Sequence, residues 1–256
     1  MKSDSLVIIP TYNEKENIRD IINAVLSISE HQFDVLIVDD NSPDGTGAIV
    51  DEMIAEQPER IHILKRAGKQ GLGTAYIAGF KWALERPYEY IIEMDADFSH
   101  PVDKLPEMQA MCATGGAHVA VGSRYLTGVN VVNWPMGRML MSYCASAYVR
   151  MITGMKVCDA TAGYVCYRRE VLQSMNLDAI EFKGYAFQIE MKFTAYCMGF
   201  IIKEVPIVFV NRVKGTSKMN TSIFFEALCG VIKLRWDSIF NKKRFERKPL
   251  PKQLTA

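Results

Sequence analysis

Short apolar runs alternate, in the first half of the chain, with longer segments whose apolar residues recur every three or four positions. Residues 5–9 form the first apolar run, and residues 16–28 follow with apolar side chains at helical spacing. The first pattern predicts a buried strand and the second an amphipathic helix. Further strands are expected at 33–40, 61–66, 88–95 and 117–125, and further helices at 47–57, 73–85 and 104–115.

The second half of the chain is less regular but shows the same two patterns. Helices are expected at 137–154 and 186–199, and strands at 161–169 and 201–210. This alternation predicts an α/β fold, with a mostly parallel Rossmann-like sheet and helices on both of its faces. No linker-like stretch divides the chain, so we expect one α/β domain over residues 1–220, followed by an amphipathic helix and a basic tail over 221–256.

Charge and hydropathy exclude several classes of protein. Thirty basic and 29 acidic residues give a net charge of +1, so no overall field attracts nucleic acid. The apolar run before Pro10 is too short for a signal peptide, and the apolar window 221–240 is interrupted by four charged residues. The six cysteines lack paired metal-ligand spacing, which favours buried thiols in a reducing compartment. We therefore expect a cytoplasmic protein without a transmembrane helix.

Polar clusters follow three of the predicted strands. They are residues 10–14 (PTYNE), 39–46 (DDNSPDGT) and 95–100 (DADFSH). Ligands of open α/β sheets bind beyond the carboxyl ends of the strands. The three clusters are therefore expected to converge at one edge of the sheet.

Asp95 and Asp97 are two carboxylates separated by one residue, directly after an apolar strand. Such a pair can hold a divalent cation, Mg²⁺ or Mn²⁺, which would neutralise a diphosphate. The alternative is a solvated turn. Convergence with the other strand ends favours the metal site. Of the four histidines, only His100 follows closely enough to share this site.

The other clusters also have simpler interpretations. Asp39 and Asp40 can accept hydrogen bonds from a nucleobase or a ribose, but residues 39–46 are rich in turn formers. PTYNE could be a helix entry capped by Asn13. Residues 68–79 lack the last glycine of a dinucleotide fingerprint and the Gly-Lys-Ser/Thr of a Walker motif, so tight packing at a helix start is expected there.

Taken together, five motifs resemble those of the family 2 glycosyltransferases of GT-A fold, most closely the polyprenol-phosphate (dolichol-phosphate) mannose synthases. The motifs are PTYNE, VDDNSPDGT, DADFSHP, GSRYLTG and NRVKGTSK, spread over roughly residues 5–220. The resemblance implies a nucleotide-sugar site with the divalent cation on Asp95 and Asp97. Its residues would be Pro10, Tyr12, Glu14, Val38, Asp40, Asp95, Ala96, Asp97, Arg124, Arg212 and Lys218.

The resemblance also implies how the phosphates are bound. Arg124, Arg212 and Lys218 would act with Asp97 as the catalytic set, because an arginine fork grips two phosphate oxygens. The segment NWPMGRMLMS resembles the acceptor segment of the family, which adds Arg138 and Ser142 to Arg124 as ligands of the acceptor phosphate. The alternative for each basic residue is a surface charge.

Ser99 departs from the pattern of the family. Some relatives have a glutamine at this position as a further metal ligand. The shorter serine side chain leaves room for a water molecule in place of that ligand.

The activity that the resemblance implies is an inverting transfer of mannose from GDP-mannose to a polyprenol phosphate, giving a β-mannosyl phosphate lipid and GDP. One alternative is another donor, such as UDP-glucose. A second is a hydroxyl acceptor, which would need a carboxylate base such as Asp159 or Glu190. A third is a catalytically silent nucleotide-sugar-binding subunit, against which intact Asp95 and Asp97 argue.

The C-terminal segment is expected to lie on the cytosolic face of a membrane, where the lipid acceptor resides. Its apolar residues at helical spacing are Ile223, Phe224, Leu228, Ile232, Ile239 and Phe240, and the basic residues that follow are Lys242, Lys243, Arg244, Arg247 and Lys248. Membrane-anchoring subunits or downstream lipid-linked glycosyltransferases would be partners there. The alternative is a helix docked on the protein core.

Overall fold

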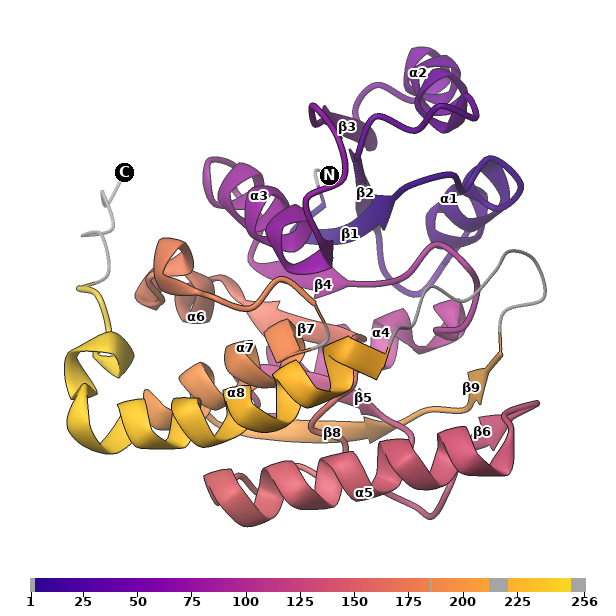
Figure 1. Ribbon diagram of the computed structural model, residues 1–256. Helices are drawn as coiled ribbons and strands as arrows, with labels where there is room; N and C mark the ends of the chain where they lie inside the picture. Colours follow the sequence, from indigo (N-terminus) through magenta and orange to yellow (C-terminus); the bar gives the residue numbers. More distant parts are fainter. Residues whose placement is uncertain (1–2, 185, 212–220, 250–256) are drawn as a thin grey trace.

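A seven-stranded sheet forms the centre of the computed structural model, which describes residues 3–184, 186–211 and 221–249, with only the backbone of 221–227 (Figure 1). The strand order is β3-β2-β1-β4-β7-β5-β8. The strands are β1 (Ser5–Thr11), β2 (Phe33–Asp39), β3 (Ile61–Lys65), β4 (Tyr90–Glu93), β5 (Val119–Ser123), β7 (Val165–Arg168) and β8 (Ile202–Pro206). Only β7 runs antiparallel to its neighbours in this sheet, so the predicted mostly parallel α/β sheet is confirmed.

The two faces of the sheet are buried by two sets of helices. Alternate residues of one strand point to opposite faces: Leu6 and Ile8 belong to one apolar cluster, and Val7 and Ile9 to the other. This explains why the strands read as continuous apolar runs. The first cluster includes residues of α3 (Leu72–Leu84), α6 (Arg169–Ser174) and α7 (Ala186–Cys197), and the second residues of α1 (Ile18–Leu26), α2 (Thr46–Glu56) and α4 (Leu105–Ala113).

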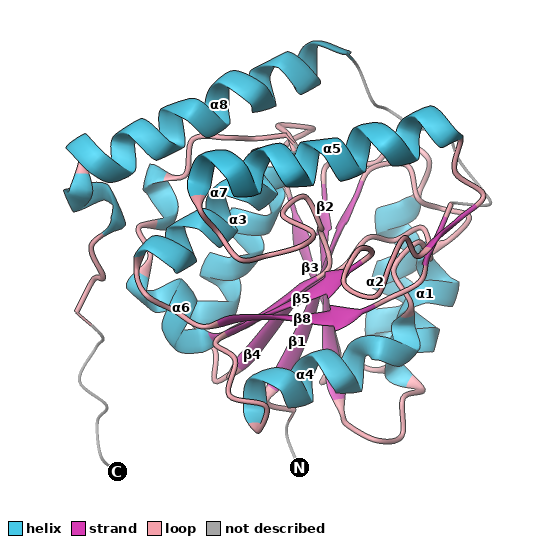
Figure 2. Cartoon of the chain, turned by 90° about the horizontal axis from the view of Figure 1, so that it is seen from below, coloured by secondary structure: helices cyan, strands magenta, loops and turns pink. Residues whose placement is uncertain are grey.

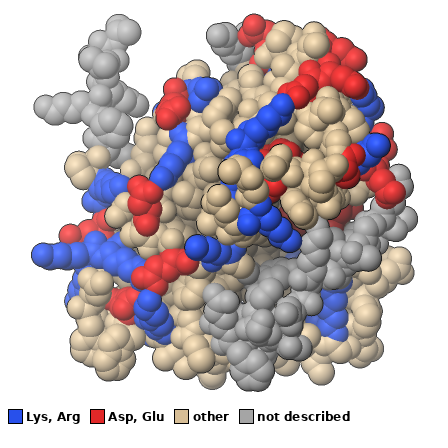
Figure 3. All heavy atoms as spheres, turned by 45° about the horizontal axis from the view of Figure 1, so that its top comes forward, with Lys and Arg blue, Asp and Glu red and all other residues tan. Residues whose placement is uncertain are grey.

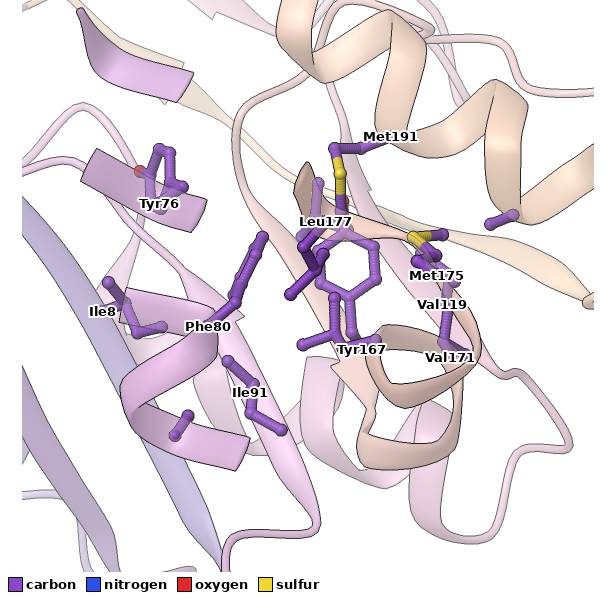
Figure 4. Packing of buried hydrophobic residues seen from close by; sticks show 14 of the residues in the cluster. Ile8, Tyr76, Phe80, Ile91, Val119, Tyr167, Val171, Met175, Leu177 and Met191 are labelled. Atoms are coloured by element: carbon purple, nitrogen blue, oxygen red, sulfur yellow. The ribbon is translucent and has the colours of Figure 1, made fainter. Parts of the chain in front are cut away.

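Aromatic side chains fill the first of these clusters. Phe80 of α3 faces Tyr167 of β7 across the interior, and Tyr76 of the same helix lies on the other side of Phe80 (Figure 4). The ring centroids of Phe80 and Tyr167 lie 5.6 Å apart in an edge-to-face arrangement, which is favourable for aromatic pairs. This packing joins the N-terminal strands to the antiparallel strand β7.

Two long helices, α5 (Met136–Thr153) and α8 (Thr221–Phe240), form a further layer outside α7 (Figure 2). Val149 of α5 and Val231 and Leu234 of α8 are buried in a third apolar cluster with Ile189 and Phe193 of α7. The remaining elements are short. They are β6 (Val131–Val132), β9 (Phe209–Val210) and the 3₁₀ turns η1 (Val102–Lys104), η2 (Leu177–Ala179) and η3 (Lys242–Phe245).

The predicted strand 201–210 is in fact two strands in different sheets. β8 ends at Pro206, and residues 209–210 pair with β6 instead. The amide of Ile207 still donates to the carbonyl of Ser123 (3.0 Å), and the chain then leaves the edge of the main sheet. Neither β6 nor α6 was predicted, because each is too short to give a periodic pattern.

Part of the basic tail is bound to the protein core. Arg244 forms ion pairs with Glu190, Glu181 and Asp237, and the guanidinium carbon of Arg247 lies 3.9 Å from the ring centroid of Phe200. Together with buried Val231 and Leu234, these contacts show that α8 and η3 are docked on the core. No helix within the described ranges is long and apolar enough to cross a bilayer.

Arg244→Ala is expected to lower the free energy of unfolding by about 3 kcal/mol, because fully buried Glu190 would lose its counter-charge. Urea unfolding of wild type and variant measures the difference. Lys243→Ala is the matched control, since this neighbouring side chain is exposed, and it should leave the unfolding midpoint unchanged. Equal stability of the Arg244 variant and wild type would contradict the role of this cluster.

Candidate functional site

The polar clusters do converge at one edge of the sheet. The amide of Asp40 donates to the carbonyl of Thr11 (3.0 Å), and the amide of Met94 donates to the carbonyl of Ile8 (3.1 Å). The loops that follow β1, β2 and β4 therefore leave neighbouring strands on the same side (Figure 1). This is the arrangement that a parallel sheet predicts for a binding site.

The loop after β1 is fastened to the loop after β2. The amides of Asn13, Glu14 and Lys15 donate to side-chain oxygens of Ser42, Thr46 and Asp44, each at 3.0 Å. Asn13 adopts a left-handed backbone with φ of 59°. It is not a helix cap, because α1 begins at Ile18 and Asn17 precedes it.

Asp40 lies at the end of β2 against a basic side chain that the sequence did not single out. Its Oδ1 is 3.1 Å from Nε of Arg66, and both side chains are nine-tenths buried. Burial raises the pKa of Asp40, although the Arg66 charge opposes that rise. Pro10 and Val38 lie on the adjacent ends of β1 and β2, and Lys69 Nζ is 5.1 Å from the ring centroid of Tyr12.

The glycine-rich segment before α3 packs tightly, as predicted. A Cβ on Gly73 would lie 2.8 Å from the carbonyl oxygen of Phe182 and 2.8 Å from the Phe187 ring. Gly71 adopts φ of 105° at the helix start, a conformation that favours glycine. These glycines let α3 approach the segment that precedes α7.

The carboxylate pair sits in a compact turn after β4. The amide of Ser99 donates to Oδ1 of Asp97 (3.1 Å), and the Ser99 hydroxyl donates a second hydrogen bond to the same oxygen. Nδ1 of His100 accepts a hydrogen bond from the amide of Asp95 (3.1 Å). The two hydrogen bonds from Ser99 thus orient the Asp97 carboxylate.

The chemistry of this turn fits a hard divalent cation. Asp95 and Asp97 offer carboxylate oxygens, which Mg²⁺ and Mn²⁺ prefer, and Mg²⁺ sites commonly use one or two carboxylates together with substrate phosphates. Ala96 between them is buried in the apolar cluster on the α4 side of the sheet. In the described part of the chain, no group of three or more His, Cys, Asp or Glu side chains is arranged to hold a metal ion.

Arg124, at the end of β5, is buried rather than a surface charge. Its Nε and Nη2 donate to the two carboxylate oxygens of Asp159 at 2.6 and 2.7 Å, and its amide donates to the same residue at 3.0 Å. Nη2 also donates to the hydroxyl of Thr161 (2.9 Å). Burial alone would raise the pKa of Asp159, but the Arg124 charge and hydrogen bonds lower that pKa overall.

Aromatic rings connect the two arginines expected at the acceptor phosphate. The guanidinium carbon of Arg124 lies 5.5 Å from the ring centroid of Trp134 and 5.6 Å from that of Phe209. Arg138 of α5 also stacks on Trp134, with its guanidinium carbon 4.1 Å from the ring centroid, and its Nη1 donates to Oδ1 of Asn211 (3.1 Å). We call Trp134, Phe209 and His100 the aromatic wall.

The aromatic wall also reaches the carboxylate turn. His100 packs edge to face on Phe209 at 5.6 Å between centroids, so the Asp95–Asp97 turn, Arg124 and Arg138 share one continuous wall. Ser142 lies beside the hydroxyl of Tyr125. Sequence reasoning missed the structural part played by Asp159, Trp134 and Phe209. The sequence did offer one signal for the two aromatic residues, because Trp134 lies in the same motif as Arg138 and Phe209 lies just before NRVKGTSK.

The carboxylates proposed as bases for a hydroxyl acceptor have other partners. Asp159 is bound by Arg124. Glu190 accepts hydrogen bonds from the amides at 181 and 182 and pairs with Arg244. Arg212 and Lys218 lie outside the described residues, so their roles stay predictions.

Basic and acidic side chains are interspersed on the face shown in Figure 3.

Comparison with known proteins finds a family that matches most of this chain. The model of the family described as glycosyl transferase family 2 matches residues 6–175. A polyprenol monophosphomannose synthase of Mycolicibacterium smegmatis is 47% identical over 224 residues, covering 88% of this chain and 84% of the relative. An undecaprenyl-phosphate mannosyltransferase of Micrococcus luteus is 45% identical over 238 residues, covering 91% and 96%.

Solved structures share the fold at low sequence identity. Glucosyl-3-phosphoglycerate synthase from Mycobacterium tuberculosis, in complex with Mn²⁺, UDP and glucosyl-3-phosphoglycerate, gives a TM-score of 0.62 at 17% identity and covers 97% of this chain and 81% of that one. A mannosyltransferase from Pyrobaculum calidifontis with GDP-Man and Mn²⁺ gives 0.57 at 17%, covering 94% and 65%. The α/β sheet is thus of the type found in these glycosyltransferases.

Asp159→Asn is expected to lower the free energy of unfolding at pH 7 by about 3 kcal/mol, because Arg124 would stay buried without its counter-charge. Folding lowers the pKa of Asp159, so its charge stabilises the fold above the unfolded pKa, about 3.9, and this contribution is lost as pH falls through the folded pKa. The difference between variant and wild type should therefore shrink below about pH 3.9. Urea unfolding over a pH series measures it.

The matched control is Asp178→Asn. Asp178 is exposed and pairs with Lys81 on the surface, where ion pairs contribute little. This variant should behave as wild type at pH 7. A difference between Asp159→Asn and wild type that does not change with pH would contradict the assignment.

Proposed function

This chain belongs to glycosyl transferase family 2, and we propose that it is an inverting mannosyltransferase that uses GDP-mannose and a polyprenol phosphate. The observation that carries the proposal is the 45–47% identity, over most of the chain, to two relatives named for mannose transfer to polyprenyl lipids. The products would be a polyprenyl β-mannosyl phosphate and GDP.

On the donor side, the nucleotide would lie across the ends of β1 and β2. Asp40 would accept hydrogen bonds from the nucleobase or ribose while Arg66 holds its carboxylate in place. Asp95 and Asp97 would hold Mg²⁺ or Mn²⁺, and such a cation, when bound, neutralises a diphosphate and stabilises the leaving nucleotide. The hydrogen bonds from Ser99 would keep the Asp97 carboxylate oriented for this task.

On the acceptor side, the nucleophile needs no protein base. A phosphate monoester has a second pKa of about 6, so it is largely an anion at neutral pH. Arg124 and Arg138 would bind it and offset its repulsion from the donor diphosphate. One acceptor oxygen then bonds to C1 of mannose as the bond from C1 to the GDP oxygen breaks, with inversion. Asp159 and Glu190, the candidate bases for a hydroxyl acceptor, are each paired with an arginine. This pairing supports a phosphate acceptor over a hydroxyl acceptor.

The test is turnover of a panel of nucleotide sugars with a polyprenol phosphate and Mn²⁺. We expect GDP-mannose to give a mannosyl phosphate lipid and UDP-glucose to give no product at equal concentration. Asp97→Asn should abolish turnover without changing the unfolding midpoint, because it removes a ligand charge at the diphosphate. Asp103→Asn is the matched control, an exposed aspartate in η1, and should keep wild-type turnover.

Two outcomes would favour the alternatives. Preference for another donor would keep the chemistry and change the sugar. Binding of GDP-mannose without turnover of any donor would indicate a silent nucleotide-sugar-binding subunit. Near-normal turnover by folded Asp97→Asn protein in saturating Mn²⁺ would remove the metal assignment.

A lipid acceptor calls for a membrane-facing surface, and α5 and α8 offer one. Exposed apolar side chains of α5 recur at helical spacing, and α8 beside it presents a second row. They are Met136, Leu140, Tyr143 and Met151 of α5, and Ile232, Trp236, Ile239 and Phe240 of α8. The expectation for the C-terminal segment did not include α5, and the side chains of Ile223 and Phe224 lie outside the described residues.

We propose that this apolar surface of α5 and α8 lies on the cytosolic face of a membrane. Amphipathic helices bind bilayers through such faces. Exposed Lys242 and Lys243 follow α8, and each basic residue near an anionic bilayer contributes about 1 kcal/mol. Arg138 lies on α5 itself, which would bring the acceptor phosphate and the membrane together. Membrane-anchoring subunits or downstream lipid-linked glycosyltransferases would meet the chain at the same membrane.

Replacement of Trp236 and Phe240 together by Glu is expected to weaken vesicle binding at least about tenfold, because burial of each ring is worth about 1.5–3 kcal/mol. Co-sedimentation with anionic vesicles measures this. Ile201→Glu is the matched control, an exposed apolar residue next to β8, and should bind as wild type does. Truncation at Asn220 would be a poorer test, since Val231 and Leu234 belong to the core. Equal binding of the double variant and wild type would reject this surface.

A further inference from the structure

Two charged side chains are fully buried between the sheet and α7, and the proposed reaction gives neither a role. Glu93 is the last residue of β4, two positions before Asp95, and Lys192 lies in the middle of α7. Both are completely shielded from solvent. Buried charges must be compensated within the protein, so their contacts show what they connect.

Hydrogen bonds run from Glu93 through α7 to a distant loop. Gln188 Nε2 donates to Oε2 of Glu93 (2.8 Å), and one turn later Lys192 Nζ lies 3.4 Å from Oε1 of Gln188. Lys192 Nζ also donates to the carbonyl of Ala162 (2.6 Å). The end of β4 is thereby connected, through two side chains of α7, to the loop that precedes β7.

That loop, residues 158–163, is the one that holds Arg124. Its Asp159 binds the Arg124 guanidinium, and Glu204 of β8 accepts hydrogen bonds from the amides of Cys158 (2.7 Å) and Asp159 (2.9 Å). Lys192 and Glu204 thus hold the loop at two points. Through Glu93, Gln188 and Lys192, the turn with the two carboxylates and the loop behind Arg124 share one set of contacts.

Stability is a poor explanation for this arrangement. Burial raises the pKa of Glu93 and lowers that of Lys192, which reflects the free energy lost when each charge leaves water. Well-packed apolar residues in place of buried charges are often as stabilising or more so. Glu93 and Lys192, joined through Gln188, therefore point to a requirement for geometry.

We propose that Glu93, Gln188 and Lys192 are positioning residues that keep the Arg124 side of the site in register with the Asp95–Asp97 side. None of the three needs to touch substrate. The inference rests on the proposed function, because register matters where a donor diphosphate and an acceptor phosphate must meet. A misplacement of about 1 Å in such a site can cost about 100-fold in rate.

The experiment compares Lys192→Met, Glu93→Gln and the double variant. Each single variant leaves one buried charge without its partner, so a lower unfolding midpoint is expected. The double variant removes both charges and should recover most of the midpoint. Because the Ala162 carbonyl still lacks its donor, we expect kcat of the double variant to stay about 100-fold below wild type. Its KM for GDP-mannose and its Mn²⁺ affinity should lie within about twofold of wild type.

Arg244→Ala serves as the matched control. It removes the buried partner of Glu190, which lies on α7 like Lys192 but binds η3 rather than the loop behind Arg124. It should lose stability and keep kcat. A double variant that fails to fold, or that regains stability and kcat together, would give the three residues a purely structural role and overturn the proposal.

A second readout does not depend on turnover. Amide hydrogen exchange of residues 158–163 should be faster in the folded double variant than in wild type or Arg244→Ala. Unchanged exchange in this loop would also overturn the proposal. If wild type turns over no nucleotide sugar, the proposed function fails, and the exchange measurement still decides whether Lys192 positions the loop.

Discussion

A buried arginine must have its charge neutralised inside the protein, and the pairing of Arg124 with Asp159 meets that requirement at the centre of the site. Three hydrogen bonds join Arg124, at the end of β5, to Asp159 in the loop before β7, and a fourth joins it to Thr161 in the same loop. The loop is in turn fastened by Glu204 and Lys192, and the rings of Trp134 and Phe209 lie close to the guanidinium. The pair thus connects β5, the loop before β7 and the aromatic wall.

The donor side is built differently. Its residues follow adjacent parallel strands, so the sheet itself brings them together. Hydrogen bonds between the first two loops hold these loops to each other. Asp40 and Arg66 form a second buried pair there. The site therefore joins a half that regular secondary structure positions and a half that irregular loops and charge pairs position.

This difference explains which parts the sequence could predict. Apolar runs and helical spacing located β1, β2 and α1 well, and the rule for strand ends placed Asp40 and Asp97 at one edge. Asp159 was considered only as a base, because a pattern along the chain does not show that it pairs with a residue 35 positions earlier. The outer face of α5 was missed for a similar reason: its apolar residues occur on several sides, and only packing against α7 and α8 decides which are exposed.

The place of β7 in the sheet has a consequence for folding. β7 lies between β4 and β5, which precede it in the chain. During synthesis, therefore, β4 and β5 cannot be joined until residue 168 has been made, and each has an unpaired edge on that side. Unpaired strand edges in partly folded chains favour aggregation. The nascent chain thus passes through a vulnerable interval that the N-terminal βαβ units alone would not create. Insertion of β7 pairs these two edges and brings the Asp159 loop to Arg124.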